Sequence, residues 1–334
     1  VVFCLLGSIA YIGYSQCTQL WQFYLLSVFV GAGLAGLAGV PISVMITNWF
    51  EEKKGLAMGI AFSGSGIGGM VYNPLINWVI TNYSWQTAYV FLGVTMLVTL
   101  LPVILFVVKA APAEVGKLPY GAGTEETLTD PGKVQGLTLA QSVKTQTFWM
   151  LGLGFLLAGL MNAGIQQHIP AYLTDIGYSS AFAANMVALF MGVLVVGKLL
   201  LGVIFDKYGS RVGSVYSCSM LALAVLMLIG ARIPILVFIM AIFYGLANAV
   251  NTVPVPYITV ETMGNRDFGV IFGIMSTFLT LGMSIGMPLS GAVFDRTGSY
   301  LPAWYLYLVM SVITAIVLVF AINKSKKYWA ENLK

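Results

Sequence analysis

Apolar runs of about 20 residues recur along this chain and constrain its fold more than any other feature. Each run is long enough to cross the hydrocarbon core of a bilayer as one helix. Charged residues make up only 8% of the chain, compared with about 25% in a typical soluble domain. The mean hydropathy is correspondingly high, at +0.90. These features predict an all-α polytopic membrane protein.

Ten segments have the length and composition of membrane spans. They cover residues 1–15, 22–47, 56–80, 89–108, 147–173, 180–204, 213–231, 234–258, 268–293 and 301–322. A polar segment rich in Gly, Thr and charge separates the first four spans from the last six and is typical of a flexible linker. We therefore predict a four-span bundle over 1–108, a linker over 109–144, a six-helix bundle over 145–323 and a tail over 324–334.

The distribution of basic residues predicts the orientation of the chain. If the linker is cytoplasmic, all but three of the 16 Lys and Arg residues lie on cytoplasmic segments. Arg232 and Arg296 fall in outer loops, and Lys198 falls within a span. Cytoplasmic loops of membrane proteins carry such an excess of positive charge. We expect a plasma-membrane protein, of prokaryotic origin, with its linker and C-terminus in the cytoplasm.

The two parts of the chain contain a parallel internal repeat at a constant offset of 214 residues. Its matched pairs include Gly55 with Gly269, Gly59 with Gly273, Gly68 with Gly282, and Pro74 with Pro288. Such repeats are typical of carriers built from two six-helix halves around a site at mid-membrane. Residues from about 140 to 214 have no partner in the first part. The repeat thus predicts a twelve-helix design of which this chain lacks the first two helices.

Other classes of site find little support in the sequence. The three cysteines, Cys4, Cys17 and Cys218, have no paired or metal-binding spacing, and a single histidine excludes a multi-histidine metal centre. The glycine-rich stretch "SGSGIGG" lies in an apolar run and lacks the Lys-Ser/Thr of a phosphate loop. We find no catalytic constellation, and we expect no enzyme activity, cofactor, ATP site or nucleic-acid partner.

The stretch "GVIFDKYGSR" carries the most specific motif. Its motif residues are Gly202, Asp206, Lys207, Gly209 and Arg211. They match the G-x-x-x-D-[RK]-x-G-x-[RK] loop of the major facilitator superfamily, which the chain resembles over essentially its whole length. The stretches "QQHIPAYLTDIGYSS" and "GKLLLGVIFDKYG" resemble, more narrowly, the oxalate/formate antiporters and related monocarboxylate porters. The resemblance implies a major facilitator fold, here with ten of twelve spans, and gradient-driven transport.

The motif loop is a candidate gate. A carboxylate is favoured at a helix N-terminus, so we expect Asp206 to lie beside the start of the helix that begins near Gly269. The two basic side chains of the loop can pair with carboxylates of the next cytoplasmic segment, Glu261 or Asp267. Such contacts would latch the inner gate in one state and break in the other. The alternative is simple positive-inside anchoring by the same basic residues.

Lys198 is the candidate substrate-binding residue. It lies eight residues before Asp206, about 12 Å deeper in a hydrocarbon core about 30 Å thick. Placing an ammonium there costs roughly 2.5–3.5 kcal/mol, and the visible spans offer no carboxylate except Glu261 near a helix end. An anionic substrate would offset that cost. The alternatives are snorkelling of the lysine toward the interface and a carboxylate partner in the missing helices.

The resemblance adds a role for Lys198. In the family, a basic residue at this place in the eighth of twelve helices binds the substrate carboxylate. Members that carry oxalate have a second basic residue in the eleventh helix, where this chain has "GIMSTFLTLG" with Leu279 or a neighbour instead. A single cation in the site favours a substrate with a single carboxylate. We therefore expect a monocarboxylate carrier, working by proton symport or anion exchange and as a monomer. The alternatives are a dicarboxylate antiporter, a non-transporting sensor and an inactive fragment.

Further polar residues within the spans are candidates for the wall of the substrate cavity. They are Asn162, Gln166, Tyr244, Asn248, Asn251, Tyr72 and Asn73. Polar side chains in membrane helices usually face the bundle interior, where hydrogen bonding between helices is the alternative role. His168, near the outer end of its span, is a candidate for proton coupling because histidine titrates near neutral pH. A position at the outer interface is the alternative reading of this residue.

Overall fold

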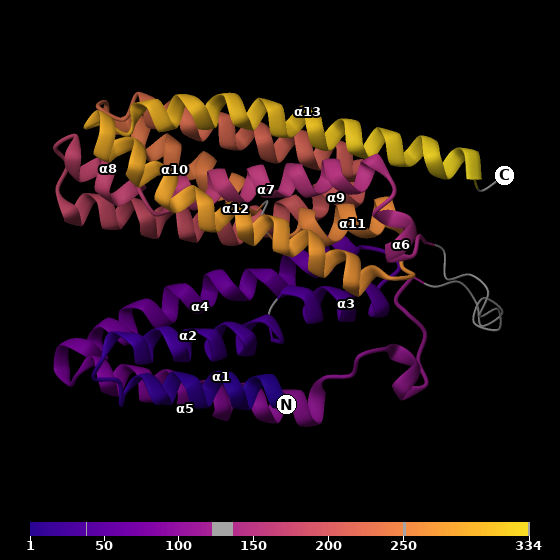
Figure 1. The fold of residues 1–334 in the computed structure, drawn as a ribbon, viewed down its shortest axis with the longest axis horizontal. Helices are drawn as coiled ribbons and strands as arrows, with labels where there is room; N and C mark the ends of the chain where they lie inside the picture. The colour runs from indigo at the N-terminus through magenta and orange to yellow at the C-terminus, as the bar shows by residue number, and fades with distance from the viewer. Residues whose placement is uncertain (38, 122–135, 250–251, 333–334) are drawn as a thin grey trace. The chain divides into compact units, whose positions relative to one another are not determined.

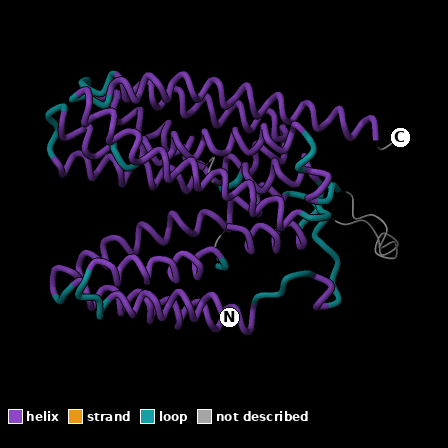
Figure 2. The backbone as a smooth tube through the Cα atoms, in the orientation of Figure 1, coloured by secondary structure: helices purple, strands orange, loops and turns teal. Residues whose placement is uncertain are grey.

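The structure is a computed structural model that describes all residues except 38, 122–135, 250–251 and 333–334. The described part of the chain is helical and contains no strand beyond two isolated bridges (Figure 2). The α-helices are α1 (Val2–Tyr14), α2 (Leu20–Ala35), α3 (Gly39–Trp49), α4 (Lys54–Asn82), α5 (Trp85–Pro102), α6 (Leu139–Ser142), α7 (Gln146–Gln166), α8 (Ile169–Asp175), α9 (Ser180–Ile229), α10 (Pro234–Asn248), α11 (Pro254–Met263), α12 (Phe268–Thr297) and α13 (Leu301–Asn332). A short π-helix, Val103–Val107, and a 3₁₀ turn, Pro112–Val115, follow α5.

The helices form two compact units. Unit 1 comprises Val1–Glu51 and Gly68–Ala122, and unit 2 comprises Glu52–Ile67 and Gly123–Lys334. Helix α4 therefore begins in unit 2 and ends in unit 1. The domain boundaries given above from the sequence divide the chain by its spans rather than by packing, and they stay a prediction.

Unit 1 is built on contacts of α1 with α2 and α5. Its buried apolar cluster comprises Ala10, Tyr14, Cys17 and Val30. In unit 2, α9 packs against α10 and α13, while α7 packs against α12 and α13 (Figure 1). The apolar core of this unit is centred on large buried rings such as Trp304, Tyr244 and Phe190. Cys4, Cys17 and Cys218 are all free and buried.

The helices follow the predicted spans, with two kinds of difference. Three of the predicted spans are each divided between two helices: α2 and α3, α7 and α8, and α10 and α11. Two other predicted spans, 180–204 and 213–231, run together as α9, which is interrupted only at Gly209 with φ 78° and ψ 174°. A left-handed φ is costly for any residue with a Cβ, so glycine lets one helix follow the other without a loop.

Six described helical segments are long and apolar enough to cross a membrane. They are Leu20–Trp49, Trp85–Val107, Gln146–Gln166, Ser180–Ile229, Phe268–Thr297 and Leu301–Lys326. The fourth has 50 residues. This length suffices for two passes of about 20 residues each.

The sequence repeat reappears in the helix boundaries. Helix α4 begins at Lys54 and α12 at Phe268, and these positions differ by the same offset that relates the matched glycines. The ends of α3 and α11 and the starts of α2 and α10 obey the same offset: Trp49 with Met263, and Leu20 with Pro234. The two parts of the chain therefore share one order of helices, as the repeat predicts.

Glycines bring α7 and α12 into backbone contact. A Cβ atom added at Gly282 or Gly286 would overlap the carbonyl oxygen of Leu156 or Leu160, closer than real Cβ atoms approach any neighbour. Lipid gives no hydrophobic force between helices, so close backbone approach and dispersion hold such pairs together. The hydroxyls of Ser290 and Tyr307, 2.5 Å apart, add a buried hydrogen bond between α12 and α13.

A pair of substitutions in α12 tests this packing. Gly286→Ala should destabilise the protein by about 1–3 kcal/mol because its methyl group meets backbone that cannot yield easily. Gly273→Ala is the matched control: its Cβ would meet nothing within 4 Å, and alanine is the better helix former by up to about 1 kcal/mol. Thermal unfolding of the purified protein in detergent measures both. Equal melting temperatures for the two variants would contradict the packing described.

Candidate functional site

Lys198 is buried within α9 and bonded to α4. The residue is only 2% exposed. Its Nζ donates to the carbonyl oxygen of Phe62 at 2.9 Å and to Oγ of Ser65 at 2.7 Å. Both partners are neutral, and no carboxylate pairs with Lys198 among the residues that the structure describes. The ammonium thus faces the first half of α4 rather than solvent, which opposes the snorkelling alternative.

Close packing of α4 on α9 makes these bonds possible. A Cβ at Gly59 would lie 2.6 Å from the carbonyl oxygen of Lys198, and one at Gly55 would lie 2.5 Å from that of Gly202. Only residues without a side chain fit there. Sequence reasoning missed Ser65 as a partner of Lys198 because the serine falls in a stripe of small residues, which is typical of plain helix packing.

Asp206 caps the N-terminus of α4. Its two carboxylate oxygens accept hydrogen bonds from the backbone N–H groups of Gly55 at 2.7 Å and Leu56 at 2.8 Å. The free N–H groups and the dipole of a helix start favour a negative charge there. The expectation of a helix-capping carboxylate was right, but the expected helix, starting near Gly269, was wrong. Asp206 lies at Gly55, which the repeat pairs with Gly269.

The basic residues of the motif loop do not pair as expected. Lys207 lies over the ring of the neighbouring Tyr208, with its Nζ 5.3 Å from the ring centroid. Within the described residues, neither Lys207 nor Arg211 forms an ion pair. Gly209 provides the non-helical position between the two parts of α9, and Gly202 provides the close approach to α4.

The carboxylates expected for that pairing are engaged elsewhere. Glu261, at the end of α11, forms an ion pair with Lys326 of α13 at 3.4 Å. Asp267 accepts a hydrogen bond from the backbone N–H of Leu139 at 2.7 Å, at the start of α6. The predicted pairs of Lys207 and Arg211 with these carboxylates are therefore wrong, because the carboxylates join the linker and the tail to the α11–α12 region instead.

Four of the predicted polar residues gather in one buried network between α7 and α10. Asn162 donates through Nδ2 to Oδ1 of Asn248 at 2.6 Å, and Asn248 donates to Oε1 of Gln166 at 3.1 Å. Tyr244, fully buried, donates to the carbonyl oxygen of Asn162 at 3.1 Å. The side chains thus bond one another, which is the interhelical role weighed above as the alternative to cavity lining.

Of the other predicted wall residues, only Tyr72 has a described side chain. Tyr72 lines a cavity of about 340 Å³ within unit 1, together with Tyr11, Thr95 and Thr99 among others. The side chain of Asn73 and the whole of Asn251 lie outside the described residues.

His168, at the start of α8, bonds to a residue within α12 and to the residue that precedes α13. Its Nε2 lies 2.9 Å from the carbonyl oxygen of Met287, and its Nδ1 lies 3.3 Å from Oη of Tyr300. A carbonyl only accepts, so Nε2 carries a proton and Nδ1 of the neutral ring accepts from Tyr300. Burial, and then the negative charges of Asp175 and Asp295, raise the pKa of Tyr300. Its hydroxyl therefore keeps its proton for this bond.

Comparison with known proteins agrees with this architecture. The family model described as Major Facilitator Superfamily matches residues 1–230 and 175–332. The structure is similar to that of the human organic anion transporter MFSD10, with a TM-score of 0.73 at 14% identity, covering 94% of this chain and 75% of that one. It is also similar to the E. coli fucose:proton symporter, with a TM-score of 0.64 at 14% identity, covering 96% and 82%. At such identity these likenesses concern the fold alone.

Two curated relatives are similar in sequence. Monocarboxylate transporter 12-B of Danio rerio is 25% identical over 328 residues, which cover 90% of this chain and 68% of that protein. The uncharacterized MFS-type transporter YcxA of Bacillus subtilis is 25% identical over 335 residues, covering 94% and 75%. The family model matches nearly the whole chain, and the relatives are transporters. The chain therefore belongs to the Major Facilitator Superfamily and is a multi-pass membrane transporter, not an enzyme.

Proposed function

We propose that this chain is a gradient-driven carrier that moves a small monocarboxylate across the plasma membrane by alternating access. The observation that carries the proposal is Lys198, a buried cation that, among the described residues, is held by a carbonyl and a hydroxyl. Hydrogen bonds to a charged acceptor are stronger than those to neutral ones. A substrate carboxylate can therefore displace Phe62 and Ser65 from the ammonium and be bound by it.

The number of cations favours a monocarboxylate over a dicarboxylate. The "GIMSTFLTLG" stretch of α12, where an oxalate carrier would place a second base, has no basic residue, and Leu279 is buried there. A second carboxylate would have to enter the site without a partner charge, which is costly in a low-dielectric environment. The relative named monocarboxylate transporter 12-B supports the same substrate class.

The polar network and His168 complete the proposed mechanism. Asn162, Gln166, Tyr244 and Asn248 would re-form their hydrogen bonds around the substrate when the helices of the cavity separate. His168 is the proposed proton-coupling group, and protonation would turn its Nδ1 from acceptor to donor toward Tyr300. The capped start of α4 at Asp206 is the proposed inner latch.

Substitution of Lys198 tests the proposal directly. Lys198→Gln should lower the uptake of [¹⁴C]lactate into proteoliposomes at least about tenfold, since a charge-assisted bond is worth about 1.5–3 kcal/mol. [¹⁴C]oxalate should be a poor substrate of the wild type. Ser63→Ala, which removes a hydroxyl that donates to the carbonyl of Ile60 in its own helix, should leave lactate uptake unchanged. Intact uptake by Lys198→Gln, or a preference for oxalate, would refute the assignment.

Substitution of Asp206 tests the latch. Asp206→Asn removes the charge and one of the two acceptors, so the start of α4 should open more often. Trypsin should then cleave after Lys53 or Lys54 about tenfold faster, because a helix cap is worth about 1–2 kcal/mol. Asp295→Asn, a change of the same kind at an exposed site of α12, is the control. Equal cleavage rates in both variants would show that Asp206 does not hold the helix start.

Substitution of His168 tests proton coupling. If the ring carries the coupled proton, lactate uptake by the wild type should rise as the external pH falls from 8 to 6, because a lower pH supplies more of the coupled ion. His168→Gln retains a hydrogen-bonding side chain but cannot titrate, so its uptake should be nearly independent of pH. A variant that keeps the full pH dependence would assign the coupling to another group.

A further inference from the structure

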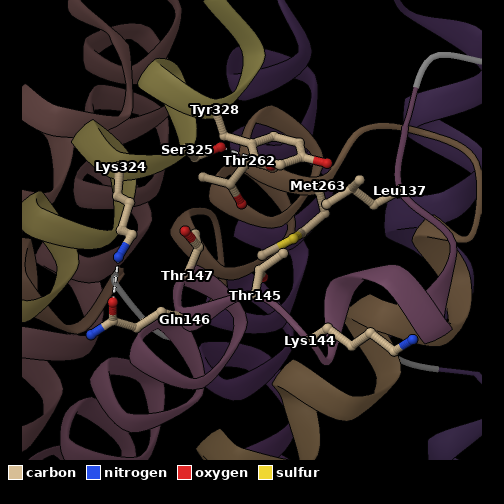
Figure 3. Close-up of a pocket in the computed structure, with 10 residues that line it drawn as sticks. All are labelled: Leu137, Lys144, Thr145, Gln146, Thr147, Thr262, Met263, Lys324, Ser325 and Tyr328. Carbon is tan, nitrogen blue, oxygen red and sulfur yellow. Dashed lines mark hydrogen bonds between the residues drawn. The ribbon is translucent and has the colours of Figure 1, made fainter. Parts of the chain in front are cut away.

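A cavity lies in unit 2 at the end where the linker joins the helical bundle. Its volume is about 280 Å³. This volume is several times the roughly 30 Å³ that one water molecule occupies in the liquid, so the cavity can hold a small ligand. Figure 3 shows its lining, which comes from the start of α7, the end of α11 and the last turns of α13. None of the lining residues belongs to the proposed substrate site.

Thr147 presents an unused hydrogen-bonding group to this cavity. The residue is 6% exposed and lines the cavity, yet its hydroxyl has no partner in the described structure. The other hydroxyls of the lining are engaged: Thr145 donates to the carbonyl of Ser142, and Ser325 donates to the carbonyl of Thr262. A hydroxyl without a protein partner is free to hydrogen-bond with a ligand. Because Thr147 lies in the cavity wall, a ligand bound there can form a hydrogen bond with its hydroxyl.

The start of α7 adds donors beside Thr147. The helix has 21 residues and no acidic residue in its first turn. Thr145 caps the N–H of Phe148 at 3.2 Å. The N–H groups of the first residues, Gln146 and Thr147, have no partner of their own within the helix. A helix start with free N–H groups and no acidic neighbour favours an anion.

Two lysines give the cavity a positive charge without a counter-charge. Lys144 precedes α7 and forms no ion pair among the described residues. Lys324 of α13 donates to the neutral Oε1 of Gln146, as the dashed line in Figure 3 shows. No Asp or Glu occurs among the described residues that line the cavity. The lining therefore includes ammonium, hydroxyl and backbone N–H donors.

We propose that this cavity binds a phosphate group. A phosphate presents only acceptor oxygens around a compact negative charge, which suits a lining of donors and cations. A metal cation finds no carboxylate there. The phosphate can belong to the headgroup of an anionic lipid, since basic pockets between membrane helices bind such headgroups, or to a free phosphate ion. The proposal does not depend on the identity of the transported substrate.

Binding to the purified full chain tests the proposal. Dioctanoylphosphatidic acid, measured by native mass spectrometry, probes the lipid headgroup, and inorganic phosphate, measured by calorimetry, probes the free ion. Dioctanoylphosphatidylcholine is the control for acyl-chain binding. We expect saturable binding of at least one phosphate probe, and a response to phosphatidic acid alone would assign the site to lipid.

Two variants connect binding to the cavity. Thr147→Val removes the unpartnered hydroxyl at nearly constant volume, and Lys324→Gln removes a charge at an exposed position. Each should weaken phosphate binding about tenfold. Thr277→Val, at an exposed threonine bonded only to its own helix, should bind as the wild type does. The proposal is overturned if neither probe binds saturably, or if both cavity variants bind like the control.

Discussion

Hydrocarbon cannot hydrogen-bond to a peptide group, and the rest of this structure depends on that constraint. Every backbone N–H and C=O at membrane depth must find a partner inside the protein, which leaves helices as the solution for a chain of this composition. Helices alone do not attract one another in lipid, so they need another reason to associate. Here glycines at the α7–α12 and α4–α9 contacts let backbone meet backbone. Gly209, which is itself non-helical, lets the two parts of α9 follow one another without a loop.

The same constraint explains why the charged groups of unit 2 say most about its candidate site. An ammonium or a carboxylate within apolar surroundings persists only where specific groups offset its desolvation. Lys198 finds a carbonyl and a hydroxyl of α4, and Asp206 finds two N–H groups at the start of the same helix. Both solutions use neutral groups. A carrier that must release its ligand is better served by such partners than by a permanent ion pair.

The sequence predicted the fold well and the contacts of the site less well. Hydrophobic length and the internal repeat placed the helices, and the motif residues pointed to the superfamily. The capping role of Asp206 was also foreseen, but not its helix, because the repeat makes the starts of α4 and α12 equivalent and only the packing distinguishes them. Ser65 was not identified as a ligand of Lys198, since a serine in a stripe of small residues is typical of helix packing. The engagement of Glu261 with Lys326 depends on where α13 ends, which no local pattern encodes.

Lys198 and Asp206 also act together on α4, as the two arms of a bivalent ligand do. They lie eight residues apart on α9, about 12 Å along its axis, and both bind α4. Once either contact forms, the other pair of groups is held at a high effective concentration, so the two contacts strengthen each other without any further interaction. Conversely, under the proposed function, a substrate that takes Lys198 away from α4 would leave Asp206 as the single remaining attachment. The proposed anion at mid-membrane would thereby loosen a helix start two turns away, with no need for a conformational signal passing through the helix.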